Sequence, residues 1–149
     1  MAVESVTCSI DLCLSLPPPI EARGDLILVV DDEEPILELF TRVLAMVGND
    51  CQVHTARNGR EALMKVQERD YDLIICNVRM PVMDGPTFYR VLKESMPWLV
   101  DRVLFCTGDT VNPRTRSFFD QEAVSYIRKP FSIEELIDLV RQKLHPRLD

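Results

Sequence analysis

Polar residues stand directly after several short apolar runs of this 149-residue chain, at points where buried strands of a sheet would end. They are Asp31, Asp32, Asn77, Thr107 and Lys129. In an open parallel sheet the carboxyl ends of the strands meet along one edge, where ligands bind. Paired carboxylates attract a hard cation, a lysine supplies a point charge for an anion, and a threonine supplies a hydroxyl donor. Together these residue types suit a magnesium ion and a phosphoryl group.

The paired acids have two explanations. Carboxylates in the first turn of a helix complement its dipole and contribute about 0.3–1 kcal/mol each, which accounts for Glu33 and Glu34. Asp31 and Asp32 stand earlier, at the end of a buried apolar run, where adjacent negative charges are costly without a cation nearby. We therefore favour a magnesium site, because Mg²⁺ binds through one or two carboxylates, keeps several waters and accepts a phosphate oxygen.

Strand and helix patterns alternate from residue 25 to about residue 145. Short apolar runs bounded by turn residues predict strands, here over residues 26–30, 52–55, 73–76, 103–106 and 124–127. Apolar residues at helical spacing predict helices over 35–47, from 59 onward, over 86–95, around 114–121 and over 133–144. Such alternation is typical of α/β proteins, so we expect a single doubly wound five-stranded parallel sheet with right-handed crossovers.

Two helix starts have the spacing of a capping box, in which a polar residue and a glutamate three positions later bond to each other's backbone N–H groups. The pairs are Asn58 with Glu61 and Ser132 with Glu135. Pro35 in turn suits the first turn of a helix. These signals indicate where three of the five helices begin.

The N-terminal segment has a different pattern from the rest of the chain. Residues 6–16 alternate apolar and polar side chains, which predicts a half-buried strand, and the proline triplet at 17–19 ends it. Because an isolated strand is not stable, it either docks on the main domain or is the last strand of a domain absent from this chain. The proline spacer favours the second option. We divide the chain into an N-terminal tail or linker at 1–24, a domain at 25–146 and a C-terminal tail at 147–149.

Composition argues against several classes of protein. With 46% hydrophobic residues the chain can build a core, and its net charge of −7 argues against direct nucleic-acid binding. The five cysteines show no CxxC spacing, as expected for small buried residues in a reducing compartment. No apolar run is long enough to span a membrane, and the N-terminus lacks the early basic residues of a signal peptide. We therefore expect a cytoplasmic protein.

Four motifs occur in one order and together resemble the response-regulator receiver domain, a CheY-like family. They are VVDDEEPI, YDLIICNVRMPVMDG, LFCTGD and YIRKPF, and the resemblance covers residues 25 to about 145. It implies a flavodoxin-like, CheY-like (βα)5 fold. It also implies a place in a two-component phosphorelay, with a sensor histidine kinase or a phosphotransfer protein as partner.

The resemblance also implies roles for the residues at the strand ends. Asp31 and Asp32 match the family's magnesium acids, and the backbone carbonyl of Arg79 matches its third protein ligand. Thr107 matches the hydroxyl residue that contacts the phosphoryl group, and Lys129 matches the family's lysine. All of these residues are therefore expected at one edge of the sheet.

Asn77 departs from the family, which carries its phosphorylated aspartate at this position, four residues before Pro81. A carboxylate oxygen attacks phosphorus and forms an acyl phosphate, whereas an amide oxygen is neutral and a poor nucleophile. Asn77 is also a weakened metal ligand, because the lost charge no longer attracts a cation. We therefore expect no phosphorylation at this site, and Mg²⁺ that is weak or absent. The amide could still hydrogen-bond Lys129.

These observations favour a pseudo-receiver, a module without enzyme activity that acts by protein–protein contacts. Tyr126 matches the family's switch aromatic, although its spacing equally suits an ordinary strand aromatic. We expect an output protein, whose identity is unknown, to bind around Tyr126 and the last helix, and a homodimer stays open. The lead-in VTCSIDLCLSLPPP resembles the closing strand and linker of a histidine-kinase ATP-binding domain, which indicates the C-terminal receiver of a hybrid kinase.

Two alternatives compete with this interpretation. One is a phosphorylatable response regulator, in which another residue accepts the phosphoryl group or a natural aspartate has been replaced at position 77. The other is a flavin-binding protein of the same topology. The acidic loop at 31–34 argues against it, because these charges would repel the flavin phosphate.

Overall fold

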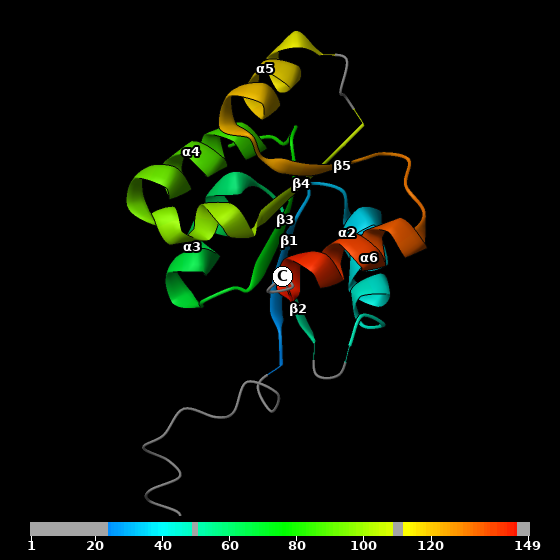
Figure 1. The fold of residues 1–149 in the computed structure, drawn as a ribbon. Helices are drawn as coiled ribbons and strands as arrows, with labels where there is room; N and C mark the ends of the chain where they lie inside the picture. Colours follow the sequence, from blue (N-terminus) through cyan, green and yellow to red (C-terminus); the bar gives the residue numbers. More distant parts are fainter. Residues whose placement is uncertain (1–23, 49–50, 109–111, 146–149) are drawn as a thin grey trace, which may run out of the picture.

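One parallel sheet, covered by helices on both faces, forms the centre of the protein. The computed structural model describes residues 24–48, 51–108 and 112–145 (Figure 1). The strand order is β2-β1-β3-β4-β5, and every neighbouring pair is parallel. The strands are β1 (Leu26–Val30), β2 (Gln52–Ala56), β3 (Leu73–Asn77), β4 (Val103–Thr107) and β5 (Ser125–Arg128). The predicted doubly wound sheet is confirmed.

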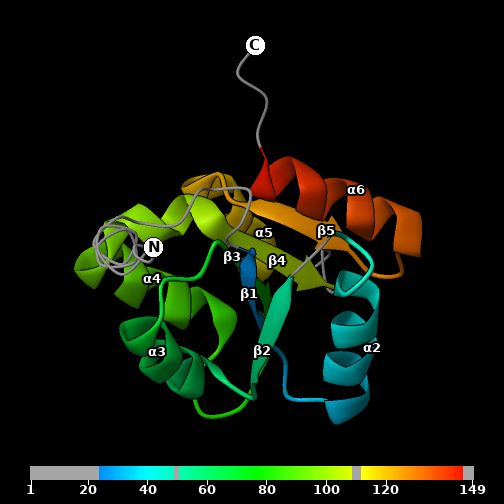
Figure 2. The same cartoon turned by 90° about the horizontal axis from the view of Figure 1, so that it is seen from below.

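The helices form two layers, one on each face of the sheet. They are α2 (Glu34–Leu44), α3 (Gly59–Glu68), α4 (Gly85–Ser95), α5 (Pro113–Glu122) and α6 (Ile133–Leu144), and a 3₁₀ helix, η2 (Pro97–Arg102), follows α4. α2 and α6 cover one face, whereas α3, α4 and α5 cover the other (Figures 1 and 2). η2 was not among the helices predicted from the sequence.

The central strands are buried on both faces, which explains their unbroken apolar runs. Leu28 and Val30 of β1 point into the core under α3, α4 and α5. Ile27 and Val29 point into the second core, under α2 and α6. All four side chains are at most 1% exposed. β1, which leads to Asp31, is thus fixed by packing on both faces.

The end of α2 differs from the prediction, because the helix stops at Leu44 although the apolar pattern continues to residue 47. The next residues make tighter turns in which each N–H bonds three residues back, Met46 to Val43 at 3.0 Å and Val47 to Leu44 at 3.1 Å. Val47 is nevertheless buried. The spacing therefore predicted burial correctly but not the hydrogen-bond pattern.

One of the two predicted capping boxes is complete. Ser132 Oγ accepts the N–H of Glu135 at 3.0 Å, and Glu135 Oε1 accepts the N–H of Ser132 at 3.2 Å. At the start of α3 only half of the box forms: Asn58 Oδ1 accepts the N–H of Glu61 at 2.8 Å. The Glu61 carboxylate reaches one residue further back and accepts the N–H of Arg57 at 3.3 Å.

The remaining predictions concern the N-terminal strand, the cysteines and the absence of a membrane span. The strand expected at 6–16 lies outside the described residues, together with Cys8 and Cys13. Cys76 and Cys106 are buried free thiols, as predicted, and Cys51 is a partly buried free thiol. In the described segments, every helix is too short or too polar to cross a bilayer.

Candidate functional site

The carboxyl ends of four strands bring the predicted site residues to one edge of the sheet. Val30 of β1 pairs with Cys76 of β3, so Asp31 and Asn77 follow at the same level. Thr107 ends β4 as a buried residue, and its carbonyl accepts the N–H of Lys129 at 2.8 Å. The strand order β1-β3-β4-β5 therefore aligns these residues along one edge. Their chemical roles stay predictions.

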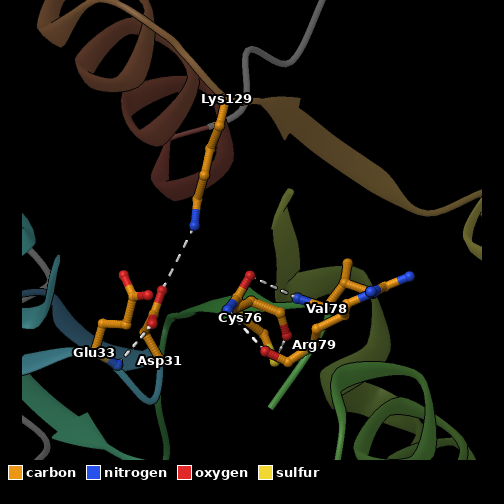
Figure 3. A network of polar contacts seen from close by, with 7 residues as sticks. Asp31, Glu33, Cys76, Val78, Arg79 and Lys129 are labelled. Atoms are coloured by element: carbon orange, nitrogen blue, oxygen red, sulfur yellow. Dashed lines mark hydrogen bonds and ion pairs between the residues drawn. The ribbon is translucent and has the colours of Figure 1, made fainter. Parts of the chain in front are cut away.

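Asp31 is a buried carboxylate with two partners. The residue is 3% exposed, and its Oδ1 accepts the N–H of Glu33 at 3.0 Å (Figure 3). Its Oδ2 lies 3.7 Å from Lys129 Nζ, which extends toward it from the end of β5 (Figure 3). Burial raises the pKa of Asp31, and the Glu33 N–H and the Lys129 charge oppose that rise only in part. Lys129 thus provides the counter-charge for an acid that is poorly solvated.

Asn77 is engaged within its own loop. Its Oδ1 accepts the N–H of Val78 at 3.0 Å, and its Nδ2 donates to the carbonyl of Arg79 at 3.0 Å. Among the contacts of the described residues, the amide bonds these two neighbours and not Lys129. In place of the possible bond to Lys129, both polar groups of the amide bond the backbone of the loop that follows β3.

Two carboxylates and one backbone carbonyl are the predicted Mg²⁺ ligands at this edge. Asp31 and Asp32 supply the hard oxygen ligands that Mg²⁺ prefers, and Asp32 is exposed to solvent. The third predicted ligand, the Arg79 carbonyl, already accepts the bond from Asn77 Nδ2. Across residues 24–48, 51–108 and 112–145, no three His, Cys, Asp or Glu side chains gather closely enough to hold a metal ion.

The loop after β3 is fixed by close backbone packing. Gly85 opens α4, and its N–H donates to the carbonyl of Val78 at 2.8 Å. A Cβ at Gly85 would lie 2.5 Å from the carbonyl oxygen of Asn77, so only glycine fits there. On the other side of the loop, the N–H of Gly59 donates to the carbonyl of Met83 at 2.9 Å. The backbone that holds Asn77 is therefore anchored to both α3 and α4.

Tyr126 lies on β5 and contacts α5. Its ring stacks on that of Phe119 of α5, with centroids 4.3 Å apart and an angle of 13° between the planes. The residue is 46% exposed. An exposed aromatic on this surface could contact a partner, and its predicted role as a switch stays a prediction.

Two features of the edge were missed from sequence. The Glu33 N–H, which bonds the Asp31 carboxylate, follows that acid by two residues, the spacing of an Asx turn. This spacing is a signal that could have been used. The peptide bond between Lys129 and Pro130 is cis, and only the proline itself hinted at that geometry.

Comparison with protein families shows that residues 27–141 match the family described as response regulator receiver domain. Among curated relatives, the DNA-binding transcriptional regulator NtrC of Salmonella typhimurium is 33% identical over 122 residues. That similarity covers 82% of this chain but 25% of the relative. The chain thus spans about a quarter of the length of this relative.

Solved structures share the fold over most of the chain. The chemotaxis protein CheY4 of Vibrio cholerae superposes with a TM-score of 0.71 at 30% identity, covering 81% of this chain and 99% of that one. The signal receiver domain of a signal transduction histidine kinase from Syntrophus aciditrophicus has a TM-score of 0.72 at 31% identity. It covers 85% of this chain and 96% of that one.

Proposed function

Because the chain belongs to the family of response regulator receiver domains, we propose that it is a receiver whose phosphoryl-transfer step is disabled at Asn77. Receiver domains in general are signalling modules of two-component systems rather than enzymes. In this proposal the module acts through contacts with other proteins. Its conformation is not switched by phosphorylation at position 77.

The hydrogen bonds of Asn77 are the observation that carries this proposal. Acyl phosphate formation needs an ionised oxygen with an electron pair directed at phosphorus. The Asn77 amide is neutral, its Oδ1 accepts the Val78 N–H, and its Nδ2 donates to the Arg79 carbonyl. Attack on phosphorus by a neutral amide oxygen would not yield an acyl phosphate, because the side chain has an amide nitrogen where the acyl phosphate needs an oxygen.

The charges at this edge of the sheet are compatible with a receiver in which no phosphoryl group is transferred. Asp31 and Lys129 form an ion pair at 3.7 Å, so the buried acid has a counter-charge that belongs to the protein. Mg²⁺, where it binds beside a phosphoryl group, neutralises the charge on the phosphoryl oxygens. We expect Mg²⁺ to bind here weakly or not at all, because the Asn77 amide contributes no negative charge and directs an N–H group at the Arg79 carbonyl.

The partners we propose are those of a receiver. A sensor histidine kinase or a phosphotransfer protein would contact the edge that carries Asn77. An output protein would contact the surface around Tyr126 and α6. Similarity to the receiver of a histidine kinase supports the placement of this chain as the receiver part of a hybrid kinase, working in the cytoplasm. A homodimer through the same surface is compatible with this placement.

Restoring the carboxylate tests the proposal. We expect Asn77→Asp to gain a phosphoryl group from acetyl phosphate and Mg²⁺, detected as a retarded band on a phosphate-affinity gel. Hydroxylamine should remove that band, because it cleaves acyl phosphates. Wild type should show no retarded band under the same conditions.

The double variant Asn77→Asp with Lys129→Ala is the matched control. If Lys129 contacts the phosphoryl group, this variant should label much less than Asn77→Asp alone. A wild-type band that survives in Asn77→Ala would mean that another residue accepts the phosphoryl group. That result would overturn the proposal.

A further inference from the structure

A groove of about 970 Å³ lies between α4 and α5, next to the polar edge of the sheet. Both helices belong to the layer that covers one face of the sheet (Figure 1). Arg79 lines the end of the groove nearest Asn77, Arg90 lines it from α4, and Arg114 lines it from the start of α5. Three separate elements thus bring a guanidinium group to one groove.

The charge of this groove is opposite to that of the whole protein. The chain carries a net charge of −7, yet Asp84 is the one acid among the described residues that line the groove. The Asp84 carboxylate caps α4, since its Oδ1 accepts the N–H of Thr87 at 2.9 Å. The groove is therefore a local cationic site on an acidic protein, and an anionic ligand complements it.

Arg90 and Arg114 form no ion pair with an acidic residue in the described part of the chain. Ion pairs there engage other lysine and arginine side chains, namely Arg57, Lys93, Arg102 and Lys129. Arg90 instead lies over the ring of Phe118, with Cζ 5.5 Å from the ring centroid. Such a contact covers one face of the guanidinium and leaves the N–H groups at its edge available for a carboxylate.

Further polar groups extend along the groove. Arg114, Ser117 and Gln121 of α5 are spaced by three and four residues, so they share one face of the helix, and all three line the groove. Arg90 faces them from α4. The donors are thus spread along a channel between two helices, as a chain-like ligand with several acceptors would require.

We propose that this groove binds an acidic peptide segment of a partner protein. Carboxylates of the segment bond the Arg90 and Arg114 guanidinium groups, and its backbone bonds Ser117 and Gln121. A long nucleic acid is disfavoured because the net charge of −7 would repel it outside the groove. A nucleotide base is disfavoured because Phe118, the aromatic residue of the groove, is 3% exposed and covered by Arg90.

This inference rests on the proposed function, because it assumes that the module acts by protein contacts. A fluorescein-labelled polyglutamate peptide is the probe, and fluorescence anisotropy at low salt measures its binding. We expect binding that weakens as salt is added. The double variant Arg90→Gln with Arg114→Gln should bind about tenfold more weakly, because each exposed charge pair contributes modestly.

The matched control is the double variant Arg42→Gln with Arg60→Gln. It removes the same charge from exposed positions on α2 and α3, outside the groove. We expect its affinity for polyglutamate to equal that of wild type. Circular dichroism melting verifies that both double variants are folded. Amide shifts in a ¹⁵N NMR titration should concentrate in residues 84–90 and 114–121.

Three results would overturn this inference: no binding of polyglutamate by wild type, equal weakening in both double variants, or amide shifts confined to α2 and α6. Displacement of the peptide by equal concentrations of inorganic phosphate or ATP would also overturn it, in favour of a site for small phosphates. Phosphorylation with acetyl phosphate tests the proposed function separately. A wild type that neither labels nor binds polyglutamate leaves that function standing and removes only the groove.

Discussion

Asn77 is a neutral amide at the position where we propose that the phosphoryl-transfer step of this receiver is disabled. Asn77 Oδ1 accepts the N–H of Val78, and Asn77 Nδ2 donates to the carbonyl of Arg79, which was predicted to bind Mg²⁺. The position of Asn77 could be predicted, because it follows a buried apolar run. Its partners could not, because they depend on the path of the backbone after β3.

We predict that Asp31→Asn raises the free energy of unfolding near neutral pH. The carboxylate is buried, and its pKa is raised chiefly by that burial, so its ionised form is costly in the fold. The Lys129 ammonium lies 3.7 Å away on a side chain that is 30% exposed, so its attraction offsets only part of that cost. Urea denaturation at neutral pH, in the absence of Mg²⁺, measures the change.

Asp32→Asn is the control for this prediction, because it removes the same charge from the neighbouring exposed residue. We expect it to change the free energy of unfolding by less than about 0.5 kcal/mol. Equal effects of the two substitutions, or a loss of stability in Asp31→Asn, would show that burial of the Asp31 charge does not determine the change in the free energy of unfolding.

Among the elements, the loop between β3 and α4 is the one that fixes the backbone around Asn77. Gly85 packs against the Asn77 carbonyl, and Gly59 at the start of α3 bonds Met83 on the far side of the same loop. The sequence predicted the start of α4 to within one residue, at 86. It gave no sign that α3 would anchor the loop, since these two segments are distant in the chain.

We predict that Gly85→Ala lowers the free energy of unfolding by roughly 1–3 kcal/mol, the usual cost of overpacking. The added Cβ would lie 2.5 Å from the Asn77 carbonyl oxygen and 2.9 Å from Phe105 Cε1, so the loop must shift. Gly48→Ala is the matched control, because a Cβ there meets no atom within 4 Å. Urea denaturation of both variants measures the difference, and equal stabilities would contradict the packing argument.

The strands and helices themselves were largely predictable. Each strand of the structure lies within one residue of its predicted bounds, because both faces of the central strands are buried and their apolar runs are unbroken. The end of α2 and the 3₁₀ helix η2 were not predicted. Apolar spacing indicates which side chains are buried. It does not distinguish an α-helix from a short 3₁₀ helix, because over a few residues both place nearly the same positions on the buried side.

At the scale of the whole molecule, His54 links stability to pH. Its Nδ1 and the Tyr71 hydroxyl oxygen lie 2.8 Å apart and join β2 to the segment before β3. Burial is the main cause that lowers the pKa of His54, and the charges of Arg69 and Lys65 lower it further. The neutral ring is thus favoured in the fold, so its contribution is lost as the pH falls below about 6.5, where the ring protonates in the unfolded chain.

We predict that wild type loses more stability than His54→Gln between about pH 7.5 and pH 5.5. The variant cannot be protonated, so the part of the pH slope that comes from this histidine disappears. Urea denaturation at both pH values gives the free energies of unfolding. Parallel slopes in the two proteins would contradict the assignment.

The cationic groove is also a property of the whole molecule. Arg90 and Arg114 lie on different helices, and their distance in the chain gave no sign that they would line one channel. The net charge of −7 had argued only against nucleic acid. Sequence patterns predict the sheet edge because strands end there together, whereas a groove between helices depends on how the helices pack.

The central claim is that this receiver accepts no phosphoryl group at position 77. Intact-mass spectrometry of the wild-type protein after incubation with acetyl phosphate and Mg²⁺ tests it most directly. We predict an unchanged mass for wild type and a gain of one phosphoryl group for Asn77→Asp under the same conditions. A phosphoryl adduct on wild type, mapped by peptide sequencing to any residue at the carboxyl edge of the sheet, would contradict the account.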